Sequence, residues 1–211
     1  MLNRNSDWIE AFSNLQIREV YYLVPLDNLN SILTNGILSM NEVTRRGLAH
    51  SDISEPSVQR RRERRGLHDS VPFYFARTTP MSFVRRELNQ ELCILVARVD
   101  RLCQRAEQLQ FTDGNGGAGN TVFYSQPAEL VDHLPLQVIR AEYWHHHPDG
   151  KRRRCAELVV QPAVSAYTIE RIEVAYPQGK PVVDAAIERA RPKQPIDWTP
   201  TSMVNPEAFF V

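Results

Sequence analysis

The sequence predicts a mixed α+β domain, and three observations support this fold class. Short apolar runs typical of buried strands recur along the 211-residue chain. Between them lie segments with apolar residues at helical spacing and with capping residues at their ends. Strands and helices do not alternate as regular βαβ units, which argues against a doubly wound parallel sheet. A chain of this length suits one domain with a substantial core, so we expect residues 1–211 to form a single unit.

The N-terminal part of the chain predicts a helix, a strand and a second helix. Residues 7–18 carry apolar side chains at helical spacing, and residues 20–24 form a short apolar run of strand type. Asp27 or Asn28 then caps a helix with one apolar face. Gly36 follows an asparagine and ends that helix, because glycine adopts the left-handed conformation at a helix C-terminus without steric cost.

Residues 41–70 are polar, rich in arginine and weakly periodic. This pattern predicts a long loop that carries a short helix over residues 57–65. A loop of this length within a compact domain is usually functional.

The rest of the chain is assigned by the same criteria. Strands are predicted at residues 71–75, 93–99, 121–124, 155–160 and 168–175. Helices are predicted at residues 81–90, 100–109 and 182–191, and in part of 127–145. Residues 191–211 are rich in proline, which predicts an extended tail that lies on the surface or frays.

The positive charge of this chain is carried by arginine. Lysines and arginines number 25 in total against 25 acidic residues, and only three of the cations are lysines. The arginines gather in two clusters, at residues 60–65 and 152–154. Because guanidinium groups bind phosphates bidentately and stack on bases, a neutral chain with such clusters can bind a polyanion at one face. The alternative is that both clusters are solvated surface loops.

Cysteine usage and hydropathy indicate the compartment. The apolar runs all fall short of the roughly 18 residues that cross a bilayer, and the N-terminal residues lack the apolar core of a signal peptide. The three cysteines are odd in number and show no CxxC spacing. We therefore expect a cytoplasmic protein with no membrane segment, disulfide framework or zinc site.

Two polar motifs suggest cofactors but fit them poorly. The glycines of residues 114–119 lack the Gly-Lys-Ser/Thr of a phosphate-binding Walker loop. The histidines at 145–147 are consecutive, so their side chains point in different directions, and no acidic residue or cysteine nearby completes a familiar metal-site spacing. We expect no metal site; the histidines either contact nucleic acid or are ordinary polar residues of a loop.

Glu157 is the most unusual charged residue, because apolar residues flank it in the strand predicted at 155–160. A buried unpaired carboxylate is costly, so this group is solvated, paired or functional. The structural alternative is that Glu157 lies on an edge strand and pairs with Arg153 or a neighbour. Cys155, next to three arginines, has either a lowered pKa or an ordinary packing role.

Several blocks of the sequence, taken in order over residues 20 to 176, resemble the DarT family of bacterial toxins, which use NAD to ADP-ribosylate bases in single-stranded DNA. The blocks are LDNLNSILTNGILS (26–39), SVQRRRERR (57–65), LHDSVPFYFARTTPM (67–81), FTDGN (111–115) and CAELVV (155–160). The resemblance implies an ADP-ribosyltransferase fold of two small packed β-sheets with flanking helices and an NAD cleft.

The same resemblance implies roles for individual residues. Glu157 matches the catalytic glutamate, and Arg61, with Arg62 as the next choice, matches the catalytic arginine. The residues implied in NAD binding are Leu23, Asn28, Arg62, Tyr74 and Met81. The residues implied in DNA binding are Asn115, Trp144, Arg152, Arg153 and Arg154.

The chain departs from the family pattern at two positions. Many members have a histidine where Pro25 stands, and some have one where Asn115 stands. Proline offers no side-chain hydrogen bond to the nicotinamide ribose, so NAD must be held partly by other groups.

The expected function is NAD-dependent mono-ADP-ribosylation of a base in single-stranded DNA, by a monomeric toxin that a macrodomain antitoxin neutralises. NAD acts as co-substrate and no metal takes part. One alternative is an ADP-ribosyltransferase that acts on RNA or protein. A second is a non-catalytic module that binds nucleic acid through its arginine clusters. The sequence leaves open whether thymine or guanine is the target.

Overall fold

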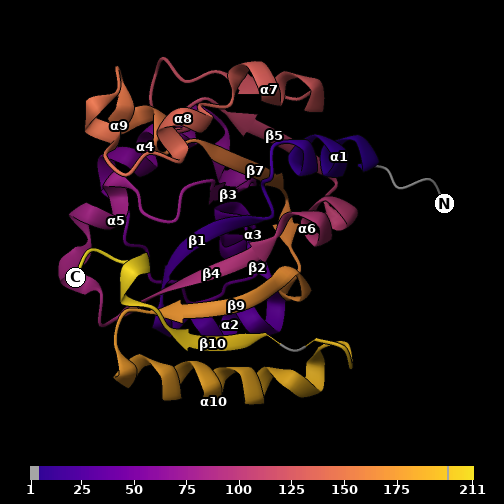
Figure 1. Cartoon of the computed structure of the whole chain (residues 1–211). Coiled ribbons are helices and arrows are strands. Elements are labelled where there is room, and N and C mark those ends of the chain that lie inside the picture. Colours follow the sequence, from indigo (N-terminus) through magenta and orange to yellow (C-terminus); the bar gives the residue numbers. More distant parts are fainter. Residues whose placement is uncertain (1–4, 199) are drawn as a thin grey trace.

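The computed structural model describes residues 5–198 and 200–211, and an eight-stranded sheet forms its centre (Figure 1). The strands of this sheet are β1 (Glu19–Pro25), β3 (Val71–Tyr74), β4 (Leu92–Arg98), β5 (Gln108–Thr112), β6 (Phe123–Tyr124), β7 (Glu157–Gln161), β9 (Ile169–Val174) and β10 (Thr201–Val204). Their order is β10-β9-β4-β1-β3-β7-β5-β6, and only the β10–β9 pair is parallel. A separate antiparallel ribbon pairs β2 (Ile37–Leu38) with β8 (Ala163–Val164).

Helices surround this sheet. They are α1 (Ser6–Asn14), α2 (Leu29–Asn35), α3 (Met40–Arg45), α4 (Pro56–Arg64), α5 (Pro80–Val84), α6 (Val99–Arg105), α7 (Leu130–His133), α8 (Leu136–Ile139), α9 (Gly150–Arg153) and α10 (Lys180–Ala190). Figure 1 shows α10 and α2 at one end of the molecule, with α1, α7 and α8 at the other. In the part of the chain that the structure describes, no helix has the length and apolar character needed to cross a membrane.

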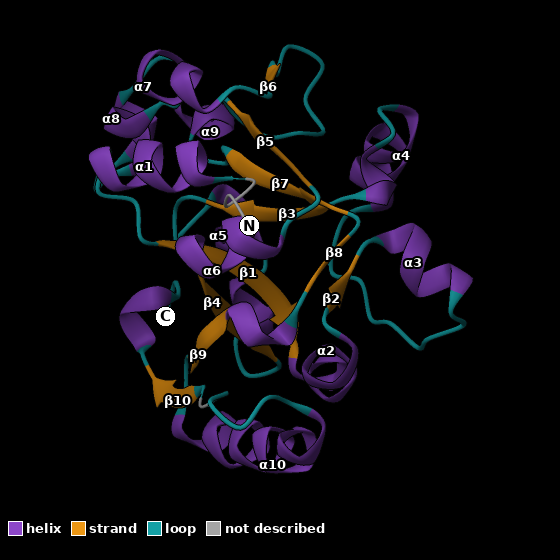
Figure 2. Ribbon diagram, turned by 90° about the vertical axis from the view of Figure 1, so that its right-hand side faces the viewer, coloured by secondary structure: helices purple, strands orange, loops and turns teal. Residues whose placement is uncertain are grey.

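The sheet is nearly divided between β1 and β3. These two strands share a single residue pair, Tyr21 opposite Tyr74, whereas β1 pairs with β4 along its whole length. Figure 2 shows β3, β7 and β5 as one group and β1, β4 and β9 as another, which run in different directions. The structure therefore joins the two predicted small sheets through one contact, and the strands diverge on the side where β1 ends.

The core explains why the predicted strands form. β4 is apolar along most of its length and is buried on both faces. Leu95 faces the main core, while Ile94 and Val96 face a second cluster closed by Phe209. Burial of each such side chain contributes about 1.5–3 kcal/mol, so the strand is fixed by packing on both of its sides.

Several segments differ from their predictions. The polar stretch at 41–70 contains most of α3 as well as the predicted short helix, and the helix predicted at 81–90 ends at Val84. The helix predicted at 100–109 ends at Arg105, and residues 108–112 form β5, whose glutamines alternate with buried side chains. The tail predicted at 191–211 is built into the fold rather than left on its surface. Residues 201–204 extend the sheet as β10, and Trp198, which is 2% exposed, donates its Nε1–H to the Ala166 carbonyl at 2.9 Å. A large buried aromatic side chain outweighs the effect of the flanking prolines.

Candidate active site

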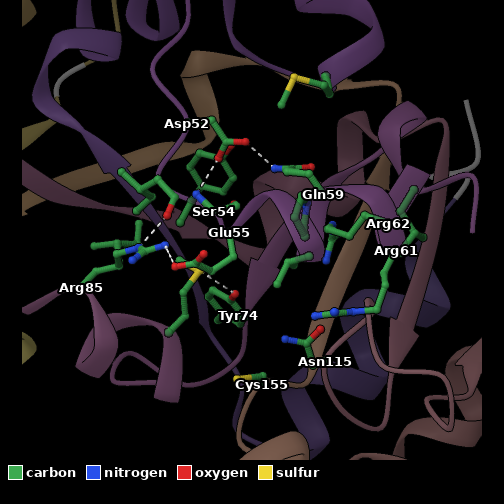
Figure 3. A pocket seen from close by; sticks show the side chains of 18 of the residues that line it. Asp52, Ser54, Glu55, Gln59, Arg61, Arg62, Tyr74, Arg85, Asn115 and Cys155 are labelled. Atoms are coloured by element: carbon green, nitrogen blue, oxygen red, sulfur yellow. Dashed lines mark hydrogen bonds and ion pairs between the residues drawn. The ribbon is translucent and has the colours of Figure 1, made fainter. Parts of the chain in front are cut away.

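A cavity of about 610 Å³ opens where β1 and β3 diverge (Figure 3). Its walls come from the end of β1, the loop at residues 50–55, α4, β3 and α5. Figure 3 shows Arg61, Arg62 and Asn115 on one side of this cavity and Arg85 on the other. The weak β1–β3 pairing leaves this space, because the residues of β1 after Tyr21 have no partner in β3.

Glu157 lies directly beside this cavity and is 0% exposed. It stands opposite Tyr74 in the β3–β7 register, so both side chains project from the same face of the sheet. Arg62 binds both carboxylate oxygens, with Nη1 at 3.0 Å from Oε1 and Nη2 at 3.2 Å from Oε2. The Gly116 N–H donates to Oε1 at 3.1 Å. Glu157 is therefore paired with Arg62, and not with Arg153 as the structural alternative proposed.

Arg62 separates the carboxylate from the cavity. The Arg62 side chain lines the cavity, whereas Glu157 is not among its lining residues. Burial opposes the charge on the guanidinium, but the adjacent Glu157 carboxylate outweighs it and raises the pKa of Arg62 above its usual value. The guanidinium and the carboxylate therefore form an ion pair at the cavity wall, with Arg62 on the cavity side.

Helix α4 and the glycine-rich loop after β5 assemble this pair. Pro56 begins α4, a position where its missing N–H costs nothing. One turn after Arg62, the Arg65 guanidinium donates to the backbone carbonyls of Ala118 and Thr121, which fastens the loop to the helix. A Cβ on Gly116 would lie 2.8 Å from Oε2 of Glu157, so this position needs glycine for close approach rather than for binding phosphate.

Of the five residues expected to bind NAD, four line the cavity and one lies behind its wall. Leu23, Arg62, Tyr74 and Met81 all line the cavity. The Tyr74 hydroxyl donates to the Met81 sulfur at 3.3 Å, and burial raises its pKa well above the usual value, so the phenol stays protonated. Asn28 lies behind the wall instead. Its side chain exchanges hydrogen bonds of 2.7 and 2.9 Å with the backbone of Ser51, which holds the 50–55 loop in place.

Arg61, the favoured catalytic arginine, occupies a different position from Arg62. It lines the cavity but is exposed, and it makes no ion pair with the residues that the structure describes. Successive helical residues point about 100° apart, so only one of the two can reach Glu157. The geometry therefore favours Arg62 as the partner of Glu157 and leaves Arg61 free to meet a ligand.

The structure also places the residues expected to bind DNA in different surroundings. Asn115 and Arg152 line the cavity, and Arg152 pairs with Asp113 at 2.9 Å and with Asp149 at 2.6 Å. Arg153 is half-buried and has no ion pair within the described residues.

Arg154 is a structural anchor rather than a phosphate ligand. It is buried, and its Nη1 donates to the carbonyls of Val138, Ile139 and Ala141 at 2.6–3.0 Å. Its Nε and Nη2 donate to the backbone and hydroxyl oxygens of Thr78. The Trp144 ring lies 5.6 Å from the guanidinium carbon. These contacts, all within the protein, argue against the expected role of Arg154 in DNA binding, which stays a prediction.

The cavity wall also carries a row of hydrogen-bonded polar side chains that the sequence does not predict. Gln59 donates to Asp52 Oδ2 at 2.5 Å and lies 2.9 Å from Nε2 of His68. All three residues line the cavity. They come from a loop, α4 and the turn after it, and no spacing rule connects such segments. The signal available from the sequence was only their place in the long polar stretch at 41–70.

A buried cysteine also belongs to this site. Cys155 lines the cavity, but burial raises its pKa to about 12, so the thiol stays protonated near neutral pH. Among the residues that the structure describes, no three His, Cys, Asp or Glu side chains are grouped to hold a metal ion.

Comparisons with known proteins identify the family. The family model described as "ssDNA thymidine ADP-ribosyltransferase, DarT" matches residues 21–209. A DNA ADP-ribosyl transferase of Thermus sp. strain 2.9 is 30% identical over 173 residues, which cover 74% of this chain and 80% of that protein. A DNA ADP-ribosyl transferase–DNA ADP-ribosyl glycohydrolase fusion protein of Thermosipho africanus is 28% identical over 169 residues. That match covers 76% of this chain but only 43% of the fusion protein.

Solved structures agree with the sequence matches. The Thermus sp. 2.9 DarT in complex with ADP-ribosylated ssDNA superposes with a TM-score of 0.80 at 23% identity, over 92% of this chain and 97% of that one. The Thermosipho africanus DarTG in complex with ADP-ribose gives a TM-score of 0.78 at 25% identity, over 92% of this chain and 51% of that one. The predicted α+β ADP-ribosyltransferase fold is confirmed. The chain belongs to the DarT family of ssDNA thymidine ADP-ribosyltransferases.

Proposed function

We propose that this protein transfers the ADP-ribosyl group of NAD to a thymidine base in single-stranded DNA. The observation that carries the proposal is the fully buried Glu157, held by Arg62 beside a cavity of about 610 Å³. The description of the family supports thymidine as the target. The related Thermus sp. 2.9 DarT has been solved with NAD+, with carba-NAD+ and with ADP-ribosylated ssDNA, which supports NAD as the co-substrate.

The reaction exchanges one glycosidic bond for another. The bond between C1′ of the ribose and the nicotinamide nitrogen breaks, and its electron pair leaves with neutral nicotinamide. Thymidine has one ring nitrogen that carries a proton. That nitrogen forms the new bond to C1′, and its proton passes to solvent. Positive charge develops on the ribose in the transition state, so a fixed carboxylate beside the sugar accelerates the reaction.

Glu157 supplies that carboxylate in our proposal. Three of its hydrogen bonds come from Arg62 and one from Gly116, an arrangement that favours charge stabilisation over proton removal. Because Arg62 lines the cavity and covers the carboxylate, we propose that the entering nicotinamide ribose takes one Glu157 oxygen from the guanidinium, which keeps the other oxygen and holds the carboxylate in place.

Arg61 and Tyr74 complete the proposed NAD site. The exposed Arg61 at the cavity edge is suited to the pyrophosphate, which arginine binds through charge-assisted hydrogen bonds. Tyr74 offers an aromatic ring to the nicotinamide. Pro25 and Asn115, the two positions that depart from the expected family pattern, both line the cavity, so polar groups of the 50–55 loop are candidates to hold the ribose hydroxyls.

A partner that removes the modification is a further part of the proposal. The Thermosipho relative joins a DNA ADP-ribosyl transferase to a DNA ADP-ribosyl glycohydrolase. We propose that a macrodomain glycohydrolase neutralises this protein as its antitoxin. Expression of the protein alone is expected to stop growth, and co-expression of a DNA ADP-ribosyl glycohydrolase is expected to restore it. The monomeric state stays a prediction, which mass photometry tests.

Radiolabelled NAD distinguishes this function from its alternatives. The protein is incubated with labelled NAD and, in separate reactions, with a thymidine-containing oligonucleotide, an RNA of matched sequence and a protein extract. We expect label only in the DNA. Label in RNA or protein would support the alternative transferases. DNA binding that weakens with salt, without consumption of NAD, would support the non-catalytic module.

A further inference from the structure

The loop between α8 and α9, residues 140–149, presents a cluster of exposed rings. Tyr143 is 52% exposed, and His145 and His146 are also exposed. Ring centroids lie 5.7 Å apart for Tyr143–His145 and 4.2 Å apart for His145–His146. The loop ends at Asp149, which lines the cavity. Flat rings at the rim of a transferase site are suited to stack on unpaired bases next to the target.

Trp144 connects this exposed cluster to the body of the protein. Its ring is half-buried and lies 5.6 Å from the guanidinium carbon of Arg154, the anchor described above. A second ring also meets it, because Phe210 packs edge-on against Trp144 with centroids 5.8 Å apart at 84°. Trp144 is therefore held by one residue next to β7 and by one from the C-terminal segment.

Phe210 is itself firmly held. Its ring meets Phe83 of α5 edge-on at 5.3 Å, and its carbonyl accepts a hydrogen bond of 2.9 Å from the buried side chain of Asn89. The preceding residue, Phe209, is buried under β4 in the second core cluster. Figure 1 shows the C-terminal segment beside α5. Phe210 thus connects the 140–149 loop, which is distant in sequence, to a C-terminal segment that is packed against the sheet.

We propose that Phe210 is a positioning residue for single-stranded DNA, because residues 205–210 brace the loop that carries Tyr143, His145 and His146. This inference rests on the proposed function. Phe210 is not among the residues that line the cavity, so the brace acts on DNA and not on NAD. A braced loop binds DNA without first losing conformational freedom, and loss of the brace therefore weakens binding.

The kinetic test uses Phe210→Ala, with Val211→Ala as the matched control because Val211 is 70% exposed. We expect KM for a thymidine oligonucleotide to rise about three- to tenfold in Phe210→Ala, the range for loss of one or two aromatic pairs. The kcat value and KM for NAD should stay within about twofold. Phe210→Tyr keeps the ring and should restore the wild-type KM for DNA. Phe210→Leu keeps apolar volume but lacks the ring. If this variant folds normally and its KM for DNA still rises, loss of the ring and not misfolding explains the effect.

Hydrogen exchange tests the brace without reference to catalysis. We expect faster amide exchange at residues 141–149 in Phe210→Ala, with unchanged exchange in α10. Unchanged exchange in the loop would overturn the brace, and faster exchange with an unchanged KM for DNA would overturn its role in positioning. If the wild-type protein neither labels nor binds DNA, the proposed function fails, and exchange alone then decides whether Phe210 holds the loop.

Discussion

Two glutamates of this protein look alike in burial and charge, yet they have different surroundings. Glu157 and Glu173 are both 0% exposed, both lie in strands of the same sheet, and both bind an arginine. Glu173 pairs with Arg171, two residues earlier in β9, at 2.8 Å and with Arg77 at 3.5 Å, and Asn205 donates to its other oxygen at 3.2 Å. Arg171 also binds Glu19 of β1. Glu173 therefore lies in a network that links β9 to β1, across β4, and to the residue that follows β10.

Glu157 has a partner of another kind. Arg62 is 95 residues away in sequence and belongs to a helix on the cavity wall, so it can move without breaking the sheet. Burial and pairing alone do not distinguish a catalytic carboxylate from a structural one. The distinction comes from the element that carries the partner arginine, because only an arginine at a cavity can give up a contact to a ligand.

Replacement of Glu157 has the largest expected effect on turnover. Glu157→Gln keeps the shape of the side chain but removes its charge, and we expect the rate of DNA labelling to fall about 10²–10³-fold. The thermal unfolding midpoint, measured alongside, should show that the variant folds. Labelling at the wild-type rate would remove Glu157 from the mechanism.

The two neighbouring arginines of α4 should separate kinetically. Arg62→Lys loses the bidentate contact with Glu157, so we expect kcat to fall about 10–100-fold. Arg61→Ala should mainly raise KM for NAD, by about tenfold, through loss of a charged phosphate contact. Arg64, an exposed residue of the same helix, provides the control variant Arg64→Ala. A larger fall in kcat for Arg61→Ala than for Arg62→Lys would restore Arg61 as the catalytic arginine.

The glycine-rich loop offers a smaller perturbation of the same pair. Gly116→Ala places a methyl group 2.8 Å from Glu157 Oε2, whereas Gly119 has no atom within 4 Å of the position of an added Cβ. We expect Gly116→Ala to lower kcat about tenfold, since misplacement of a reacting group by a fraction of an ångström is costly. Gly119→Ala should match the wild type in steady-state labelling, and equal losses in both variants would argue against the close approach.

Glu173 should affect stability and leave turnover unchanged. Glu173→Gln weakens a buried ion pair while Arg171 keeps Glu19, so we expect the free energy of unfolding to fall by about 2–3 kcal/mol. Urea denaturation measures this loss, and labelling by the folded fraction should equal that of the wild type. A specific loss of turnover would mean that the two glutamates do not differ as described.

The sequence predicts the strands better than the contacts between them. The strands predicted at 93–99 and 155–160 form, because continuous apolar runs have no stable place outside a core. β5 was not predicted, since Gln108 and Gln110 resemble a continued polar helix. The choice between Arg61 and Arg62 depends on the rotation of α4 about its axis, which tertiary packing sets. The burial of Arg154 likewise depends on carbonyls of residues 138–141 that only the folded chain brings to it.

The most direct test of the central claim is mass spectrometry of a thymidine-containing oligonucleotide after incubation with NAD and each glutamate variant. The account predicts one added ADP-ribosyl group on thymidine with the wild type and with Glu173→Gln, and almost none with Glu157→Gln. An equal yield of adduct from both variants, or an oligonucleotide left unmodified by the wild type, would contradict it.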